Sequence, residues 1–455
     1  MSVHGSSLHG SRLGVLTGVG PLERDVELPS AWVGYRAHVA RMDRVVDWVA
    51  DPIGFGASFG DHAAARGAAI GEAVERYCGN AVPRHLERSS YRELRARGVD
   101  ALDPVSFALY SPEQYVSRGF PFVPFTTDTP VEWVEGTDMH DGRAVLAPAG
   151  SVYLNYIRGS RTAEPPLHSL MYSGIATGTS RQRAEQSALE ELFERDATSI
   201  WWASGADTRR LDDDGRVIGQ MGCPAPGFDL DVTLIHIPSH FGVPVVGALV
   251  RDRARELVAF GSACRATPHA AATKALVEAL GSMQLSRQLA DPDSETWQSV
   301  RTGAMPDHVF LPYRGDRSYL DAVGENFRHL VDLPAVAQLY QDRRMQTGTA
   351  LLRLEPPDRV AIDEIPAVAG SARESYLAAL ARHGIDAVVV DLTTNDIARS
   401  GLRVVRVLAP QLVGNGPPAF PLHGSPRLLE VPAALGWNVH PRTRADLVTV
   451  PLPLA

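Results

Sequence analysis

Apolar side chains recur at helical spacing in the run from Ser173 to Trp202. The positions that fall on one side of a 3.6-residue repeat are Leu189, Leu192, Phe193 and Ile200. This spacing predicts a helix with one buried face. Glu191 and Glu194 are three residues apart, so the same helix places two carboxylates side by side. Because like charges repel at this distance, we expect a cation or Arg195 to offset them.

The same pattern occurs earlier in the chain, at Ala69 to Arg76. Aligned on Glu72 and Glu191, both copies read Ala, Leu or Ile, any residue, Glu, two more residues, Glu and Arg. A weaker third copy, Ala275 to Leu280, keeps its glutamate at Glu278, but Gly and Ser follow where the second Glu and the Arg stood. The sequence therefore predicts a repeated helical unit.

Small residues precede each copy, as Gly54 to Gly60, Gly174 to Ser180 and Gly261 to Ala263, and we predict a loop at each place. Backbone N–H groups in such loops approach anions closely, and the start of the following helix adds a favourable dipole. Four carboxylates on two helices beside such loops predict a nucleoside triphosphate held through Mg²⁺, which prefers oxygen ligands. The alternative, two surface helices with solvated charges, explains one such helix but not the repetition.

Apolar or alternating runs elsewhere predict the strands of a layered α/β body. We expect strands at Asp229 to Ile237, Val243 to Val250, Ala387 to Leu392 and Leu402 to Leu408, the last two as partners. The polar segment before residue 50 is predicted to be a partly mobile arm with helix at Trp32 to Val49.

Composition narrows the class of protein. The chain has 455 residues, 44% of them hydrophobic, which is enough for two lobes or one large α/β unit. Its 44 Lys and Arg against 53 Asp and Glu give a net charge of −9, which argues against a nucleic-acid partner. Cys78, Cys223 and Cys264 are far apart, so neither a disulfide framework nor a structural zinc site is indicated. Because no stretch is long enough to span a bilayer, we expect a soluble cytoplasmic protein with no membrane partner.

The repeated units resemble the motifs of a known family, the YcaO superfamily, whose members use ATP to activate peptide backbone amides. The resemblance rests on Gly71 to Tyr77, Ser173 to Ser180 and Ala188 to Asp196, and Ala275 to Arg287 is similar to the later Glu- and Gln-bearing helix of the family. It covers about residues 50 to 430. It implies an α/β fold of YcaO type, with internally repeated loop–helix units around mixed sheets. The implied division is an N-terminal arm at 1–50, a catalytic domain at 51–430 and a C-terminal tail at 431–455.

Site residues follow from the positions that match the family motifs. The resemblance implies that the metal ligands are Glu72, Glu75, Glu191 and Glu194. It implies nucleotide contacts from Ser58, Arg76, Ser173, Gly178, Thr179, Arg195, Glu278 and Gln284, and a catalytic role for Arg195. The chain departs from the family pattern at Thr179, Arg183 and Gly281, where many members have Asn, Glu and Gln, and it lacks the lysine of the first loop. These departures concern nucleotide contacts and leave the four glutamates unchanged.

The implied activity is that of a peptide cyclodehydratase that forms azoline rings. A Cys, Ser or Thr side chain of a ribosomal precursor peptide attacks the preceding amide, ATP phosphorylates the amide oxygen, and loss of phosphate leaves a thiazoline or oxazoline. A separate leader-peptide-binding protein is the implied partner, and a homodimer stays open. Thioamide or amidine formation at the same ATP site, and an ATP-binding accessory protein without turnover, are the alternatives.

Alternating prolines end the chain, from Val450 to Ala455, and favour an extended, semi-rigid segment. In the azoline-forming branch of the family a proline-rich C-terminus enters the active site. The resemblance therefore implies a catalytic, proton-transferring role for the carboxylate of Ala455. A frayed chain end is the alternative.

Overall fold

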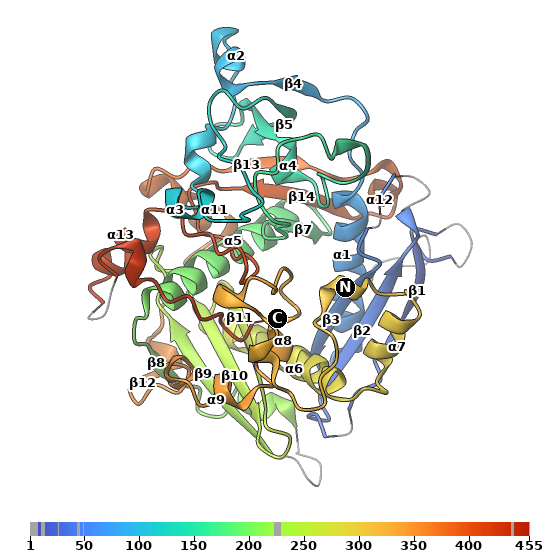
Figure 1. Cartoon of the computed structure of the whole chain (residues 1–455), viewed down its shortest axis with the longest axis vertical. Helices are drawn as coiled ribbons and strands as arrows, with labels where there is room; N and C mark the ends of the chain where they lie inside the picture. Colours follow the sequence, from blue (N-terminus) through green and yellow to red (C-terminus); the bar gives the residue numbers. More distant parts are fainter. Residues whose placement is uncertain are drawn as a thin grey trace.

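In the part of the chain that the structure describes, three β-sheets and three long helices make up the body of the molecule (Figure 1). The computed structural model describes residues 8–10, 14–25, 27–42, 46–48, 50–222, 229–437 and 441–454. Cys223 and Ala455 lie outside these ranges. The packing of helices against several sheets confirms the predicted α/β class.

The first sheet contains the N-terminal strands in the order β1 (Leu16–Pro21), β2 (Trp32–Val39) and β3 (Ile53–Phe59). Both pairs are antiparallel, and Trp32 of β2 lies opposite Phe59 of β3. The prediction of a helix is therefore wrong for Trp32 to Val39, and residues 43–45 and 49 of the predicted segment lie outside the described residues. Side chains alternate between buried and half-buried along most of β2, and the strands on both sides satisfy the backbone groups that a helix would have paired internally.

The second sheet has the order β4 (Glu87–Ser89), β5 (Val131–Asp138), β13 (Val388–Asp391), β14 (Arg403–Leu408) and β7 (Ile175–Gly178), and β6 (Ala144–Pro148) pairs with β5 outside this order. Its pairs are antiparallel. Val388 lies opposite Leu408, so the pairing predicted for the strands at 387–392 and 402–408 is confirmed. β14 lies inside the sheet, between β13 and β7.

The third sheet has the order β11 (Leu257–Cys264), β10 (Val245–Asp252), β9 (Leu230–Ile237), β8 (Arg209–Asp212) and β12 (Arg359–Ala361). The three long strands are antiparallel, whereas β12 runs parallel to β8. β9 and β10 confirm the strands predicted at 229–237 and 243–250. Every residue of β11 is buried, because helices contact this strand from two sides.

Each long helix lies between two sheets. α1 (His62–Gly79) contacts β3 and β7, α5 (Arg181–Ser204) contacts β7 and β11, and α6 (Pro268–Ala290) contacts β11 and β3. Each helix begins after a strand, at a side chain that accepts a hydrogen bond from the third backbone N–H of the helix. These capping residues are Asp61, Ser180 and Thr267. The predicted repeat is therefore a strand, a capping residue and a helix.

Glycines in these strands let the helices approach closely. A Cβ on Gly56 of β3 would lie 2.2 Å from the backbone N of Ala69 in α1. A Cβ on Gly261 of β11 would lie 2.5 Å from the backbone O of Ala275 in α6. The small residues predicted as phosphate-binding loops thus lie largely in strands, and the loop prediction is wrong for them. Close contact with a helix backbone is the physical reason for glycine at these positions.

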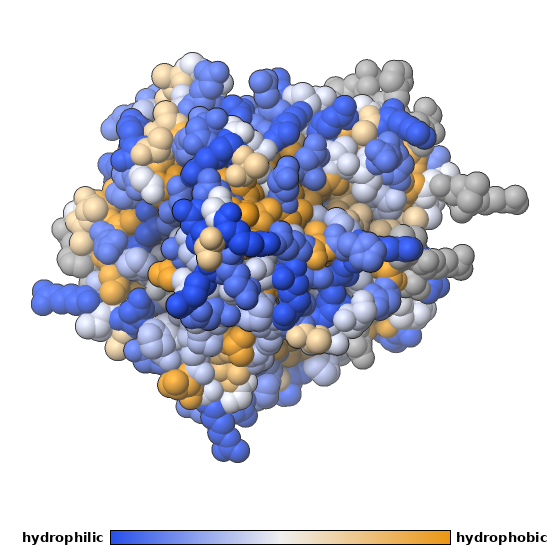
Figure 2. All heavy atoms as spheres, turned by 90° about the horizontal axis from the view of Figure 1, so that it is seen from above, coloured by the Kyte–Doolittle hydropathy of each residue, from blue (hydrophilic) through white to orange (hydrophobic). Residues whose placement is uncertain are grey.

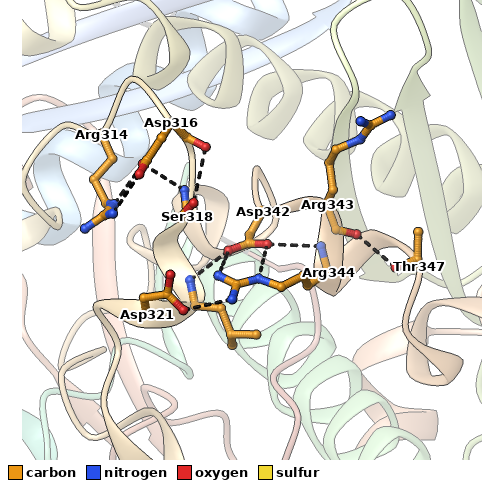
Figure 3. Close-up of polar contacts among 9 residues, drawn as sticks. Arg314, Asp316, Ser318, Asp321, Asp342, Arg343, Arg344 and Thr347 are labelled. Carbon is orange, nitrogen blue, oxygen red and sulfur yellow. Dashed lines mark hydrogen bonds and ion pairs between the residues drawn. The ribbon is translucent and has the colours of Figure 1, made fainter.

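Shorter helices complete the described chain: α2 (Tyr91–Ala96), α3 (Pro112–Tyr115), α4 (Ala149–Val152), α7 (Glu295–Arg301), α8 (Val336–Leu339), α9 (Arg343–Gln346), α10 (Thr349–Leu352), α11 (Ala372–Arg382), α12 (Asn395–Arg399) and α13 (Arg427–Ala434). Ion pairs hold the irregular segment around α9 (Figure 3). Arg344 donates to both carboxylate oxygens of Asp342, at 3.0 and 2.7 Å, and to Asp321 at 2.8 Å. Asp342 is buried and also accepts from the backbone N–H of Leu320, so one carboxylate ties α9 to the preceding turn.

The face of the molecule that carries α2 has a mixed surface (Figure 2). Seen from the end that carries α2, hydrophilic side chains cover most of the molecule and hydrophobic ones show mainly between them (Figure 2). Within the described ranges, no helix combines the length and the apolar character needed to cross a membrane.

Candidate active site

The two repeated helices bring the four predicted metal ligands into one cluster. Glu72 and Glu75 lie on α1, Glu191 and Glu194 lie on α5, and both helices pack against β7. Glu75 is close enough to Glu72 and Glu191 for their charges to act on it, and Glu191 acts on Glu194 in the same way. The carboxylates are therefore neighbours across two helices that lie far apart in the sequence.

Backbone donors orient the two glutamates of α1. Glu72 accepts from the backbone N–H of Phe55 in β3 at 2.8 Å and from Arg76 at 2.7 Å. Glu75 accepts from the backbone N–H of Thr177 in β7 at 2.6 Å. Backbone groups of the strands beside α1 thus hold both of its carboxylates.

Similar donors orient the glutamates of α5. Glu191 accepts from the backbone N–H of Gly174 at 3.0 Å, and buried Glu194 accepts from the hydroxyl of Ser262 in β11 at 2.7 Å. Sequence reasoning missed Thr177 and Ser262 as donors. Their positions in the strands just before α5 and α6 were the available signal, since the repeat places such a strand beside each glutamate.

The electrostatics of the cluster favour a bound cation. Burial and the neighbouring charges of Glu72 and Glu191 together raise the pKa of Glu75 to about 8, although the hydrogen bond from Thr177 and the charge of Arg76 lower it. Burial also raises the pKa of Glu194, despite Arg195 and Ser262. A divalent cation would relieve this crowding of carboxylates, and oxygen donors are the ligands that Mg²⁺ prefers. The donor set therefore fits the predicted metal by its chemistry.

The described residues do not contain a preformed metal site. Across ranges 8–222, 229–437 and 441–454, with the short gaps given above, no three His, Cys, Asp or Glu side chains have the geometry to hold a metal ion. The four glutamates instead bond to backbone groups, to Ser262 and to their own arginines. Metal binding at this cluster stays a prediction.

Two arginines accompany the glutamates. Arg76 pairs with Glu72, and its guanidinium lies 3.8 Å from the centre of the Tyr172 ring. Arg195 lies 3.2 Å from Glu194 and 3.8 Å from Glu191. The Nε of each arginine is buried without a hydrogen-bond partner. Each arginine can therefore still donate a hydrogen bond to an anion such as phosphate. Such a bond would remove the cost of a buried donor without a partner.

The other predicted nucleotide contacts are dispersed. Ser58 donates to the backbone carbonyl of Asp61, and Ser173 donates to Asn415 at 3.1 Å. Gly178 lies against the backbone of α5, where a Cβ would be 2.5 Å from the N of residue 184. Thr179, the next residue, is exposed. These residues border the start of α1 and α5, and their contact with a nucleotide stays a prediction.

The two predicted residues of α6 differ in their surroundings. Glu278 pairs with Lys274, and although burial raises the pKa of Glu278, Lys274, Arg265 and Arg195 together lower it. Glu278 therefore lies near Arg195 of the cluster. Gln284, two turns later, is buried and donates to the backbone carbonyl of Glu23 at 2.9 Å, so it contacts the segment before β2 rather than Glu278.

The C-terminal tail lines one side of a cavity. Residues 448–452, Leu454 and Arg195 all line this cavity. Three donors from different elements hold its carbonyls: Trp202 Nε1 to Val450 at 2.6 Å, the Tyr340 hydroxyl to Pro451 at 2.5 Å, and the backbone N–H of Phe260 to Pro453 at 3.1 Å. Figure 1 shows the tail near the centre of the molecule, beside α8 and β11. Leu454 lies opposite Phe260, two residues before Ser262, which bonds Glu194. The predicted catalytic group, the carboxylate of Ala455, falls outside the described residues.

Fold and site together define an α/β protein in which repeated helices bring carboxylates and arginines beside a cavity. The chain belongs to the YcaO family: the family model described as YcaO cyclodehydratase, ATP- and Mg²⁺-binding, matches residues 55–413.

Three further proteins are similar to this chain. An uncharacterized protein of Methanothermobacter thermautotrophicus is 27% identical over 227 residues, which are 47% of this chain and 53% of that protein. A heterocyclase solved in complex with substrate and cofactor has a TM-score of 0.67 at 19% identity, over 99% of this chain and 56% of that one. YcaO from Methanopyrus kandleri, solved with AMPPCP and Mg²⁺, has a TM-score of 0.54 at 21% identity, over 88% of this chain and 90% of that one. The chain thus spans about half the length of the first two proteins, and the structural likenesses show the fold.

Proposed function

We propose that this protein is an ATP- and Mg²⁺-dependent cyclodehydratase of ribosomal precursor peptides, which converts Cys, Ser or Thr into thiazoline or oxazoline. The observation that carries the proposal is the cluster of Glu72, Glu75, Glu191 and Glu194 with Arg76 and Arg195, on the repeated helices of a YcaO-family chain.

The cluster would hold Mg²⁺ through its four glutamates, and bound Mg²⁺ would neutralise charge on the transferring phosphoryl group. The arginines supply planar guanidinium groups suited to phosphate oxygens. Packing of α5 against β11 keeps water away from Glu194, which accepts from Ser262 of β11 and is 6% exposed. Positioning and electrostatics of this kind account for phosphoryl transfer without a protein nucleophile.

The reaction balances as follows. The sulfur or oxygen of the substrate side chain bonds to the preceding carbonyl carbon, its proton leaves to a base, and the C=O electron pair moves to the carbonyl oxygen. That oxygen takes the γ-phosphoryl group of ATP and releases ADP. The carbon–oxygen bond then breaks with phosphate as the leaving group, while the amide nitrogen passes its proton to a base and forms the C=N bond of the ring.

We propose the Ala455 carboxylate as the base, delivered by the tail that Trp202, Tyr340 and Phe260 hold. Pro451 and Pro453 have no backbone N–H, so this segment is bound through carbonyls and keeps an extended shape. We also propose that a separate leader-peptide-binding protein presents the precursor.

Reconstitution with a Cys-containing precursor peptide, the presenting protein, ATP and Mg²⁺ tests the function. We expect peptide-dependent release of ADP with loss of one water from the peptide mass. Exchange of an oxygen for a sulfur would indicate thioamidation, and nucleotide binding without ADP release would indicate an accessory protein. Either result would contradict the proposal.

Glu194→Gln tests the metal assignment, because it removes one charged oxygen ligand and keeps the size of the side chain. We expect Mg²⁺-dependent nucleotide affinity and turnover to fall at least tenfold, an effect of about 1.4 kcal/mol. The matched control is Glu185→Gln, which changes another buried glutamate of α5 whose partners are Arg181 and Arg373, outside the cluster. Equal affinity and turnover in both variants would rule out Glu194 as a ligand.

A further inference from the structure

Arg406 occupies a core position in β14. Side chains of a strand alternate between its two faces, so Arg406 shares a face with Val404 and Leu408. Both neighbours belong to the apolar core that also contains Val388 and Val390. Arg406 itself is only 2% exposed. A charged guanidinium group thus lies where the alternation of the strand predicts an apolar side chain. This exception to the pattern requires a physical reason.

No carboxylate of the described chain lies within ion-pair distance of Arg406. Its Nη1 and Nη2 donate to the backbone carbonyls of Tyr172 and Met171, at 2.9 and 3.1 Å, and its Nε is buried without a partner. Burial lowers the pKa of Arg406 to about 10, and the charge of Glu191 opposes this from further away. The side chain is therefore a charged group in the core whose hydrogen-bonding capacity is only partly used.

Ser151, which is buried, and His168, which is half-buried, form a second polar pair nearby. The Ser151 hydroxyl lies 3.1 Å from Nε2 of His168, and Nδ1 lies 2.7 Å from the backbone carbonyl of Ser169. Because a carbonyl only accepts, Nδ1 carries the hydrogen and Nε2 accepts the proton of Ser151. Burial, with the charge of Arg406, lowers the pKa of His168 to about 4, so the ring stays neutral. Ser151 is left with lone pairs as its free hydrogen-bonding capacity.

Ser151 and Arg406 line a second cavity, which differs from the one that the C-terminal tail lines. Its walls are otherwise mainly apolar and include Met171, Leu192 and Leu408, and Arg195 of the glutamate cluster lines it as well. The cavity therefore offers a cationic donor and a neutral acceptor between apolar walls, next to the predicted phosphate site. A free phosphate or a carboxylate could accept from Arg406 but would repel the lone pairs of Ser151. An amide satisfies both residues, because its oxygen accepts and its N–H donates.

We propose that this cavity binds the reacting backbone amide of the peptide, with Arg406 donating to the carbonyl oxygen and Ser151, positioned by His168, accepting from the N–H. The assignment rests on the proposed function and names the residues that hold its substrate. The carbonyl oxygen gains negative charge when the side chain attacks, so Arg406 interacts more strongly with the transition state than with the bound peptide.

Steady-state kinetics of ring formation test the role of Arg406. We expect Arg406→Gln to lower kcat for ring formation roughly 10²–10³-fold, as loss of an oxyanion donor does, while nucleotide affinity stays within about twofold of wild type. The matched control is Arg403→Gln on the same strand, because Arg403 bonds to the carbonyls of Ala398 and Leu402 and does not line the cavity. Wild-type kcat in Arg406→Gln, or a loss confined to nucleotide affinity, would overturn the proposal.

Chemical rescue separates a catalytic role from a structural one. Added guanidinium ion should restore ring formation by Arg406→Ala, since it can replace the missing donor in the cavity. A variant that folds as wild type does but is not rescued would count against the proposal. If the Arg406 variants fail to fold, Ser151→Ala tests the amide site instead. This variant should raise the peptide KM and leave nucleotide affinity unchanged.

A double-mutant cycle tests the positioning role of His168. If His168 acts through Ser151, then His168→Ala should raise the peptide KM as Ser151→Ala does, and the double variant should be no worse than either single variant. Additive effects would remove His168 from the proposal.

Binding of an unreactive amide keeps this proposal distinguishable from the proposed function. N-acetylglycyl-alanine N-methylamide offers a backbone amide but no nucleophile, and ligand-observed NMR reports its binding. We expect binding to wild type and Arg403→Gln, and weaker binding to Arg406→Gln. Binding of this pattern without ring formation from any precursor would refute the proposed function and support the amide site. Equal binding by wild type and Arg406→Gln would refute the amide site.

Discussion

At Glu75 the local surroundings oppose ionisation. The carboxyl group is withdrawn from water and lies near the charges of Glu72 and Glu191, and the hydrogen bond from Thr177 offsets only part of this. Its pKa of about 8 in the folded protein compares with an ordinary value of 4.5. Such a group weakens the fold at neutral pH, which is typical of residues placed for function rather than for stability.

This difference in pKa predicts how stability depends on pH. Between pH 4.5 and about 8 the unfolded chain releases a proton that the folded protein keeps, so the free energy of unfolding falls as pH rises through this window. Each unit of pKa difference corresponds to about 1.4 kcal/mol. In Glu75→Gln this contribution is absent. Urea denaturation with a chelator present, at roughly pH 5 and pH 8, should therefore show Glu75→Gln gaining stability relative to wild type at the higher pH.

The control for this measurement is Glu374→Gln, an exposed position on α11. Its stability should follow that of wild type at both pH values. If the curve of Glu75→Gln also runs parallel to that of wild type, Glu75 titrates like an exposed glutamate and the crowding of the cluster is refuted.

The repeated element of the fold is a strand followed by a capped helix, and it depends on close backbone contact. Gly56 and Gly261 face α1 and α6 at distances that leave no room for a Cβ. The same strands also carry donors to the helix glutamates, from Phe55 of β3 to Glu72 of α1 and from Ser262 of β11 to Glu194 of α5. Tight packing of each strand and helix therefore shapes the site as well as the core.

Gly261→Ala tests this contact. The added methyl group would collide with the backbone of α6 at Ala275 and Ala279, each 2.5 Å away. We expect the free energy of unfolding to fall by roughly 1–3 kcal/mol or more, as overpacking of a core does. Chemical denaturation measures the change. Gly67→Ala in α1 is the control, because a Cβ there meets no atom within 4 Å, and its better helix propensity should stabilise the protein by up to about 1 kcal/mol. Equal effects of the two substitutions would contradict the packing argument.

On the scale of the whole molecule, the C-terminal tail joins elements that are distant in sequence. Trp202 of α5, Tyr340 after α8 and Phe260 of β11 bond consecutive parts of it. Removing the tail from this position would expose the cavity beside Arg195, since residues 448 to 452 and Leu454 line it. The tail is thus part of the wall of the candidate site, and the alternative of a frayed end does not describe residues 448–454.

Deleting Leu452 to Ala455 should reduce peptide modification far more than nucleotide binding, because it removes the proposed base and part of the cavity wall but none of the glutamates. Adding residues after Ala455 should have the same effect, since it converts the terminal carboxylate into an amide. Ring formation and nucleotide affinity, measured side by side, check both variants. Full activity of the extended chain would exclude the terminal carboxylate as the base.

Trp202→Phe is the milder companion to these variants. It keeps an aromatic ring but removes the donor to Val450. Ring formation should decrease, and nucleotide affinity should stay unchanged. Equal losses of both would show that Trp202 supports the fold of α5 rather than the position of the tail.

Features that depend on local periodicity and on repeated motifs could be predicted before the structure was known. The helix around Glu191, its copy around Glu72, the strands at 230–237 and 245–252, and the family of the chain could all be predicted, because spacing of apolar side chains reflects which face an element buries. The paired carboxylates followed from the same spacing, since residues three apart share one side of a helix.

The contacts between those elements could not be predicted, because they depend on how the whole chain packs. The stretch from Trp32 to Val39 is a strand because β1 and β3 pair with it, and the glycines before the helices lie in strands because helix backbones press against them. The grouping of Glu75 with Glu191, the place of Arg406 beside Ser151 and His168, and the course of the tail also join residues that are far apart in sequence. Local periodicity records whether a side chain is buried, but not which distant segment buries it, and that choice belongs to the packing of the whole chain.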